Sequence, residues 1–243
     1  GSMSTNLLTL EGVHTHIGAY HILHGVDLVV PRGELTMLLG RNGAGKTTTL
    51  RTIMGLWQAS QGRITFGGED ITQLNTPAIA QKNIAYVPEN MGIFSDLTVK
   101  ENMLLAARSA QNAAQMDEAR LQWIFKLFPA VEKFWNHPAG KLSGGQKQML
   151  AVSRAIVEPR DLLIIDEPSK GLAPAIIQNM IDAFQQLKAS GVTILLVEQN
   201  IHFAQQLGDT VAVMDNGRVV HAGRMQALAE DTALQQSLLG LAL

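Results

Sequence analysis

The stretch GRNGAGKT, residues 40–47, has the residue types and spacing of a loop that binds phosphate. It lies between an apolar run typical of a buried strand and a segment typical of a helix, which is the context that this motif requires. Glycines let backbone N–H groups surround phosphate oxygens at the positive end of a helix. We expect Lys46 to reach the β- and γ-phosphates and the Thr47 hydroxyl to bind Mg²⁺. The residues expected to contact the nucleotide here are Gly40, Arg41, Asn42, Gly43, Ala44, Gly45, Lys46, Thr47 and Thr48.

Two acidic residues, Asp166 and Glu167, directly follow the apolar run LLII. Proteins with a phosphate loop of this kind end a second strand in an aspartate that helps to hold Mg²⁺. We expect Asp166 to have that role. Glu167 is placed to orient or deprotonate a water that attacks the γ-phosphate. The two motifs together predict hydrolysis of a nucleoside triphosphate.

The stretch LSGGQ, residues 142–146, opens a long predicted helix and offers a second anion site. Ser143, Gly144, Gly145 and Gln146 would present backbone N–H groups outward from the start of that helix. The phosphate loop alone is also compatible with a kinase, a GTPase or a helicase. LSGGQ, lying between the phosphate loop and Asp166, argues against these three classes. A second phosphate site would have a role if two copies, or two homologous chains, packed head to tail. The Ser-Gly-Gly segment of each chain would then contact the ATP held by the other.

The elements that would position these motifs alternate between strands and helices in the last third of the chain. Asn216-Gly217 is a strong signal for a tight hairpin there, and Gly67-Gly68 is a weaker one in the first third. Continuous apolar strands separated by helices predict a parallel sheet covered on both faces. The strands are expected at 35–40, 161–166, 192–197 and 210–214, and the helices at 174–188 and 201–207.

The middle of the chain has a helical pattern. Thr98 and Glu101 form a predicted capping box ahead of an Ala- and Leu-rich helix that would run to about Ala110. The stretch DEARLQWIFKLF predicts another helix, which Pro129 would end. Because this block lies between strand-rich segments, we expect residues 89–157 to form a helical subdomain within one domain of residues 3–243.

Composition excludes several functional classes. The 243 residues suffice for one large domain, and a net charge of −2 provides no basic surface for nucleic acid. The absence of cysteine excludes disulfides and thiolate chemistry, and seven scattered histidines do not suggest a dedicated metal site. Gly1 and Ser2 before Met3 are expected to be a cloning remnant, and no signal peptide is expected. No apolar run approaches the roughly 18 residues of a spanning helix.

The chain resembles the ATP-binding-cassette ATPases over essentially its whole length. The phosphate loop, LSGGQ, the strand ending in Asp166 and the final strand block appear in that family's order. The resemblance implies an α/β fold: a P-loop NTPase with a RecA-like core, an antiparallel β subdomain and a helical subdomain that carries LSGGQ, the signature motif. It also implies ATP and Mg²⁺ as cofactors, and ATP-driven dimer closure coupled to a membrane partner.

Three departures from the wider family resemble the second ATP-binding subunit of branched-chain amino acid importers, the hydrophobic amino-acid uptake class. Glu89 follows IAYVP where most members have glutamine, Ala173 lies in SKGLAP where most have aspartate, and Gln199 lies in LLVEQN where most have histidine. The implied partners are integral-membrane permease subunits, a homologous ATPase subunit and, indirectly, a substrate-binding protein. The ATPase pair would be a heterodimer, with a homodimer as the alternative, at the cytoplasmic face of the plasma membrane. Urea, short amides or other small acids are alternative cargoes.

These departures affect the expected chemistry. We expect Glu167 to act as the base, Lys46 to bind phosphate and Gln199 to be a neutral sensor, because an amide can donate a hydrogen bond but cannot carry a proton. Glu89 is either a third metal ligand beside Thr47 and Asp166 or part of the surface where the permease docks.

The adenine contact is also unusual in this chain. Ile17 stands where the family places an aromatic residue that stacks on adenine, and an aliphatic side chain recovers only part of such a contact. His16 and Tyr20 are the alternative groups for holding the base. We therefore expect modest ATP affinity for the isolated chain.

Two other functions of this family fit the sequence less well than import. A clamp that acts in DNA repair or translation usually carries two cassettes or large insertions and often a basic surface, whereas this chain has one compact cassette and a slightly acidic balance. An exporter-type ATPase for lipid or lipopolysaccharide also uses a separate compact subunit. Its relatives usually keep the histidine that Gln199 replaces, which favours the importer.

Overall fold

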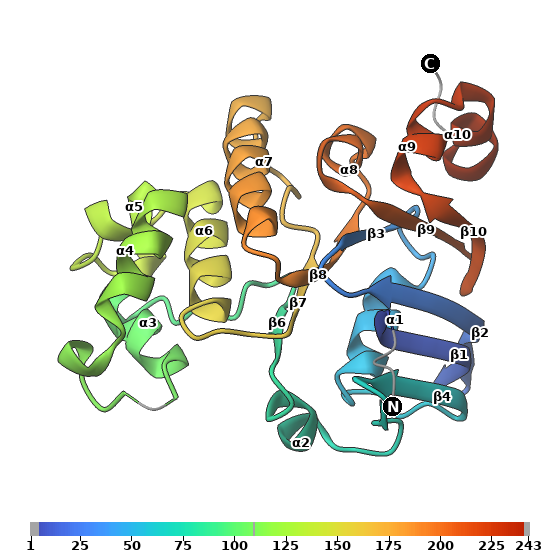
Figure 1. The fold of residues 1–243 in the computed structure, drawn as a ribbon, viewed down its shortest axis with the longest axis horizontal. Coiled ribbons are helices and arrows are strands. Elements are labelled where there is room, and N and C mark those ends of the chain that lie inside the picture. The colour runs from blue at the N-terminus through green and yellow to red at the C-terminus, as the bar shows by residue number, and fades with distance from the viewer. Residues whose placement is uncertain (1–4, 109, 241–243) are drawn as a thin grey trace.

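The computed structural model describes residues 5–108 and 110–240, so Gly1 and Ser2, the expected cloning remnant, lie outside the described residues. Figure 1 shows a central sheet, a smaller antiparallel sheet beside it and a lobe made of helices. Within the described ranges, no helix is both long and apolar enough to cross a bilayer.

The central sheet has six strands in the order β10-β9-β3-β8-β7-β6. All its neighbouring strands run parallel except β9 and β10. Every residue of β3, β7 and β8 is buried, as expected for parallel strands covered on both faces. The predicted parallel sheet is therefore confirmed. The bounds are β3 Leu35–Leu39, β6 Ile84–Val87, β7 Leu162–Asp166, β8 Thr193–Glu198, β9 Thr210–Asp215 and β10 Arg218–Arg224.

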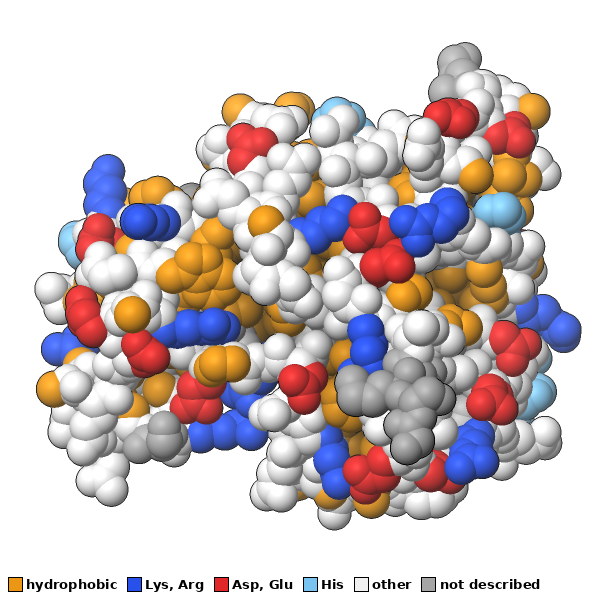
Figure 2. Space-filling model, in the orientation of Figure 1, with side chains coloured by type: hydrophobic (Ala, Val, Ile, Leu, Met, Phe, Trp, Pro, Cys, Tyr) orange, Lys and Arg blue, Asp and Glu red, His pale blue; other side chains and the backbone are white. Residues whose placement is uncertain are grey.

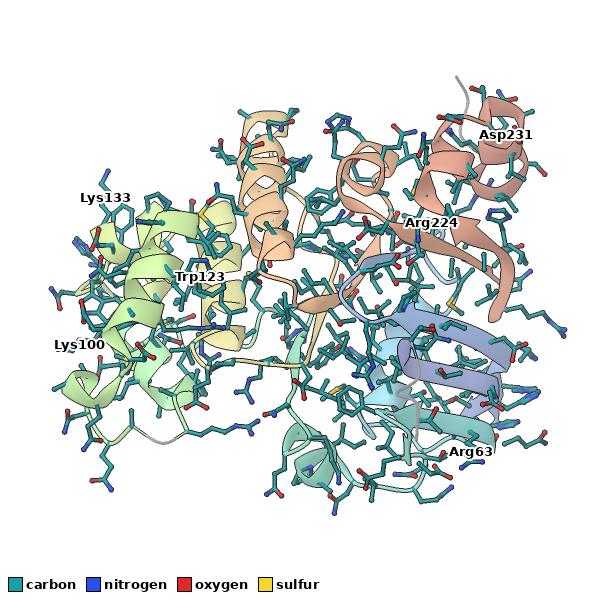
Figure 3. The ribbon with its side chains drawn as sticks, viewed as in Figure 1. Arg63, Lys100, Trp123, Lys133, Arg224 and Asp231 are labelled. Atoms are coloured by element: carbon teal, nitrogen blue, oxygen red, sulfur yellow. The ribbon has the colours of Figure 1, made fainter. Side chains whose placement is uncertain are left out.

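Alternate residues of these strands belong to two hydrophobic clusters, because successive side chains point to opposite faces of a sheet. On β7, Leu163 and Ile165 pack with helices α7 and α8, whereas Leu162 and Ile164 pack on the side of α1 and the antiparallel sheet. The helix bounds are α1 Lys46–Ile53, α7 Pro174–Ala189, α8 Ile201–Leu207, α9 Met225–Ala229 and α10 Thr232–Leu239. Figure 3 labels Arg224 at the end of β10, where its guanidinium binds Glu34 at 2.7 Å.

The antiparallel sheet has the order β2-β1-β4-β5, and both predicted glycine turns lie in hairpins. Gly67 and Gly68 connect β4 to β5, and Asn216 and Gly217 connect β9 to β10. Asn216 and Gly217 have φ values of 47° and 74°, which this type of two-residue turn requires at both positions. The bounds are β1 Asn6–Ile17, β2 Tyr20–Pro31, β4 Gln61–Phe66 and β5 Glu69–Asp70.

The helical lobe contains α3 Val99–Ala106, α4 Glu118–Leu127, α5 Pro129–Lys133 and α6 Gly144–Ala155, with 3-10 turns at Ala113–Gln115 and Ala139–Lys141. The predicted capping box is present, since Thr98 Oγ1 accepts from the Glu101 N–H and Glu101 accepts from the Thr98 N–H. Figure 3 shows Trp123 on α4 within the lobe, whereas Lys100 and Lys133 lie at its outer edge.

One helix end differs from the sequence prediction, and a second predicted end is followed at once by another helix. Helix α3 ends at Ala106, so the predicted extension to about Ala110 was wrong. The chain leaves the helix at Ala107, and Arg108 then donates from Nη2 to the Ala80 carbonyl oxygen at 2.8 Å. Pro129 ends α4 as predicted, but it also begins α5, because proline suits the first position of a helix.

The short helix α2 (Thr76–Ala80) was not predicted. It is built from local signals, because Asn75 Oδ1 accepts from the Ala78 N–H at 3.0 Å and Pro77 occupies the first turn. The ribbon of α2 is separate from the helical lobe in Figure 1, and the Arg108 side chain joins the two through its bond to Ala80.

Asn102 fixes the segment that leads into the lobe. Its side chain is fully buried on α3. Oδ1 accepts from the Phe94 N–H at 2.8 Å, and Nδ2 donates to the carbonyl oxygens of Phe94 and Thr98, each at 2.9 Å. These bonds hold the loop before α3 against the helix.

We predict that Asn102→Ala lowers the free energy of unfolding by about 2–3 kcal/mol, because the backbone groups of Phe94 lose their buried partner. Urea denaturation without nucleotide measures the change. Gln122→Ala is the matched control, since Gln122 is exposed and its amide donates to the side chain of Glu118, and its effect should stay within about 0.5 kcal/mol. An Asn102→Ala loss as small as the control's would contradict this account.

Candidate functional site

The predicted phosphate loop joins β3 to α1, and α1 begins at Lys46. Glycine is required at two of its positions. A Cβ at Gly40 would lie 2.6 Å from the Met214 carbonyl oxygen, and Gly45 has φ 105° with Leu23 only 3.0 Å from where its Cβ would be. The loop borders a cavity of about 270 Å³. Its lining residues are Ile22, Asn42, Gly43, Gly45, Lys46, Thr47, Thr48, Glu89 and Glu167.

Lys46 is a buried cation at the floor of this cavity. Its side chain is only 4% exposed, its Nζ donates to the Gly40 carbonyl oxygen, and Nζ lies 3.5 Å from Glu167 Oε1. Burial lowers the pKa of Lys46, whereas the neighbouring charges of Glu167 and Asp166 raise it. The Glu167 carboxylate therefore helps to keep the buried Lys46 ammonium charged.

Asp166 ends β7 with its two carboxylate oxygens in different surroundings. Thr47 Oγ1 donates to Asp166 Oδ2 at 3.0 Å, while Asp166 Oδ1 is buried and makes no hydrogen bond within residues 5–108 and 110–240. Burial raises the pKa of Asp166 to about 6, helped by the charges of Glu167 and Glu89. An unsatisfied carboxylate oxygen beside a hydroxyl is a donor set that suits a hard divalent cation. These residues therefore fit Mg²⁺.

Glu167 lies in an unusual backbone conformation directly after β7. Its φ is 46°, a left-handed value that costs energy for a residue with a side chain, and its N–H donates to the Val197 carbonyl oxygen at 2.9 Å. Gln199 Nε2 donates to Glu167 Oε1 at 3.1 Å and also to Asn42 Oδ1. The structure therefore brings together Lys46, Glu167 and Gln199, the three residues predicted to be catalytic.

Two acidic residues, Glu198 and Glu89, bind different residues of the loop that follows Glu167. Glu198 is buried at the end of β8 and accepts from the N–H and the hydroxyl of Ser169, at 3.0 and 2.8 Å. Glu89, on the loop after β6, forms an ion pair with Lys170. The predicted third metal ligand is thus at the cavity, but its carboxylate is bound to a lysine.

The signature residues lie outside this cavity's lining. Ser143 caps α6, its Oγ accepts from the Gln146 N–H at 3.2 Å, and Gln146 Oε1 accepts from the Ser143 N–H at 3.0 Å. A Cβ at Gly145 would lie 2.5 Å from Ile176 Cγ2, so the first turn of α6 packs closely on α7, while Gly144 is exposed. Of the predicted nucleotide ligands, Ser143, Gly144, Gly145 and Gln146 are absent from the lining of this cavity, as are Gly40, Arg41 and Ala44 of the phosphate loop itself.

Ile17 is also absent from that lining. It pairs with Tyr20 across the β1–β2 turn, and Tyr20 is 75% exposed. The register shift between Thr15 and His16 leaves Ile22 without a cross-strand partner in the hairpin, and Ile22 is the apolar residue that reaches the cavity. A bulge commonly re-aims a side chain in this way.

His16 stacks on His21 instead of facing the cavity, with ring centroids 4.2 Å apart, and His21 also contacts His14 and His24. Among the described residues, no group of three or more histidine or acidic side chains is arranged to hold a metal ion. The histidine cluster therefore adds nothing to the donor set around Asp166.

Sequence reasoning missed three residues at this site: Ile22, Lys170 as the partner of Glu89, and Glu198 as the anchor of Ser169. Glu198 had a readable signal, because it follows an apolar strand just as Asp166 does. The positions of Ile22 and Lys170 depend on strand register and on contacts distant in sequence.

We predict that Asp166→Asn stabilises the ligand-free protein at neutral pH. The pKa of Asp166 in the folded chain, about 6, lies above the ordinary aspartate value of 3.8, so ionisation of this carboxylate destabilises the folded chain as pH rises from 3.8 to about 6. At pH 7.5 the variant should be more stable by up to about 3 kcal/mol, and this advantage should shrink towards pH 4.5. Urea denaturation with a chelator and no nucleotide measures it.

The exposed Asp96→Asn is the control for this measurement and should show no such pH-dependent difference. An Asp166→Asn variant that is less stable at pH 7.5, or whose difference from wild type does not change with pH, would show that burial does not destabilise this carboxylate.

Comparisons with known proteins agree with this geometry. The family model described as ABC transporter matches residues 23–170. The chain is 40% identical over 237 residues to the high-affinity branched-chain amino acid transport ATP-binding protein BraG of Pseudomonas aeruginosa, covering 96% of this chain and all of that protein. It is 34% identical to the probable branched-chain amino acid transport ATP-binding protein LivF of Archaeoglobus fulgidus, covering 91% of this chain and 93% of that protein.

Among solved structures, MJ1267, an ATP-binding cassette of an ABC transporter, superimposes with a TM-score of 0.82 at 26% identity and covers 97% of this chain and 98% of its own. The predicted α/β fold of a P-loop NTPase is confirmed. Because the family match spans more than half of the chain and the relatives align over nearly all of it, this chain belongs to the ABC transporter family, as one of its ATP-hydrolysing subunits.

Proposed function

We propose that this chain is the ATPase subunit of an importer for branched-chain, hydrophobic amino acids. The observation that carries the proposal is the 40% identity to BraG, which extends over the whole of that protein. Glu89, Ala173 and Gln199, the three departures from the wider family, support the same assignment. In this proposal residues 3–243 form one cassette, in which residues 89–157 are the helical subdomain.

The proposed hydrolysis uses groups already gathered at the cavity. Lys46 exchanges Glu167 for the β- and γ-phosphates of ATP, and the backbone N–H groups of the phosphate loop bind the same oxygens. Thr47 and Asp166 hold Mg²⁺, which neutralises charge on the transferred phosphate when it is bound. Glu167, released from Lys46, takes a proton from the attacking water, and the Gln199 amide holds Glu167 or the γ-phosphate by a hydrogen bond.

We propose that a second ATPase chain completes the site. The start of α6 carries Gly144 and Gly145 between the two residues of its capping box and does not line the chain's own cavity, so in this proposal it faces a nucleotide held by another subunit. The preferred arrangement is a head-to-tail heterodimer with a homologous ATPase, and a homodimer is the alternative. Ile22 would contact the nucleoside beside the phosphate loop, with Ile17 near the hairpin turn.

The proposed permease site is a groove of about 420 Å³ between α2 and the helical lobe. Ala80, Pro88, Met91 and Leu105 provide apolar walls, and Arg108, Arg154 and Arg160 add positive charge. Figure 2 shows that the molecule is indented between these two parts. A cytoplasmic segment of a membrane permease that combines apolar and acidic side chains would fit there. The chain would then act at the cytoplasmic face of the plasma membrane, with a substrate-binding protein delivering solute on the other side.

The test of this function is uptake of labelled leucine by cells that lack this chain and carry either wild type or Glu167→Gln. We expect wild type to restore uptake and Glu167→Gln to fail, with ATPase activity reduced at least about a hundredfold because the base is removed. Glu132→Gln, an exposed carboxylate on α5, is the control and should restore uptake. Labelled urea is measured in parallel, and restoration of urea uptake alone would replace the proposed cargo.

We further predict that Gln199→His keeps ATPase turnover within about tenfold of wild type, about 1.4 kcal/mol of barrier, because either side chain can donate a hydrogen bond to Glu167 or to a phosphate oxygen. Gln199→Leu, which has no donor, should lose more. Steady-state ATPase assays of wild type, Gln199→His and Gln199→Leu test this prediction. A loss of several hundredfold in Gln199→His would mean that the neutral amide itself is required.

A further inference from the structure

The ion pair between Glu89 and Lys170 connects two loops at the carboxyl edge of the central sheet. Glu89 lies two residues after β6, and Lys170 lies four residues after the end of β7. These strands are parallel neighbours, so their following loops emerge side by side. The two residues are 81 positions apart in sequence.

The backbone of Lys170 is fixed even though its side chain is 58% exposed. Its N–H donates to the Glu167 carbonyl oxygen at 3.2 Å, and the preceding Ser169 is held by two hydrogen bonds to Glu198. The Lys170 ammonium can therefore change partners without a shift of the loop that carries it.

Lys170 provides a second positive charge beside a group of carboxylates. Asp166, Glu167 and Glu89 all lie close enough to raise the pKa of Lys170, and the hydrogen bond and charge of Glu89 contribute most. Lys46, the other cation, already binds Gly40 and Glu167. Lys170 is thus the partner that neutralises Glu89 when no ligand is present.

Glu89 also lines the same cavity as Thr47, and its charge raises the pKa of Asp166. A divalent cation held by Thr47 and Asp166 would attract the Glu89 carboxylate, which cannot satisfy the cation and the Lys170 ammonium equally. Building on the proposed function, we propose that Lys170 is a positioning residue that competes with Mg²⁺ for Glu89, so that loading the cavity releases the Lys170 side chain.

The competition predicts a specific coupling. Lys170→Met should tighten Mg²⁺ binding about twofold to fivefold, the range expected for one exposed ion pair, because Glu89 is freed. Glu89→Gln should weaken Mg²⁺ binding. In the Glu89→Gln background Lys170→Met should have no further effect, and Lys170→Arg should bind Mg²⁺ like wild type because it keeps the pair.

The experiment is calorimetric titration of Mg²⁺ into the purified chain saturated with a non-hydrolysable ATP analogue, for wild type, both single variants and the double variant. Lys82→Met is the matched control, because it breaks an ion pair with Glu69 that is also partly exposed but does not line the cavity, and it should leave Mg²⁺ affinity unchanged.

An equal effect of Lys170→Met with and without Glu89 would mean simple repulsion between Lys170 and the cation, and would overturn the proposal. So would an unchanged affinity in Lys170→Met. Lys170→Gln provides a second test of the same coupling if the methionine variant folds poorly. This titration needs neither a permease nor transport, so its outcome is separate from that of the leucine uptake assay.

Discussion

Charged side chains are buried at the carboxyl edge of the central sheet, and the site depends on the hydrogen bonds and ion pairs that stabilise them there. An ionised group taken out of water is costly unless a partner replaces its hydration. Lys46 has the Gly40 carbonyl and Glu167, and Glu198 has Ser169. Asp166 Oδ1 is the exception, because it has no hydrogen-bond partner among the described residues, and a cation held together with Thr47 would supply one.

The parallel register places these groups within reach of one another. Asp166 pairs with Val197 and Leu39 pairs with Glu198, so β7, β8 and β3 end at nearly the same level. Helices cover one face of the central sheet, and α1 and the antiparallel sheet cover the other. At the carboxyl edge the buried strands lead into the loops that carry the charged residues of the site. The left-handed turn at Glu167 then directs its carboxylate back towards Lys46.

Features governed by short-range rules could be predicted from the sequence. The phosphate loop, the caps at Thr98 and Ser143 and the turn at Asn216-Gly217 each depend on a few neighbouring residues, and each is present. Features that depend on distant residues could not be predicted. The end of α3 is associated with a contact between Arg108 and Ala80, and the exposure of Ile22 to the cavity depends on the register of two strands.

The same distinction between local and distant contacts applies to the residues of the candidate site. Asp166 and Glu167 were readable because they follow an apolar strand, whereas the partner of Glu89 was not, because Lys170 reaches it only through the side-by-side emergence of two loops. Charged residues near a predicted site therefore need a structure before their partners can be assigned.

Arg154 on α6 holds two segments at once, since its Nη1 donates to the Gly92 carbonyl oxygen at 2.7 Å and its Nε to the Asn102 carbonyl oxygen at 3.1 Å. The loop that carries Glu89 is thereby tied to the same helix whose first turn carries Ser143. Because one planar guanidinium makes both bonds, a displacement of that loop would act on α6, the helix that begins at the signature residues. The loop beside the phosphate cavity and the helix that begins at the signature residues are therefore joined through one side chain.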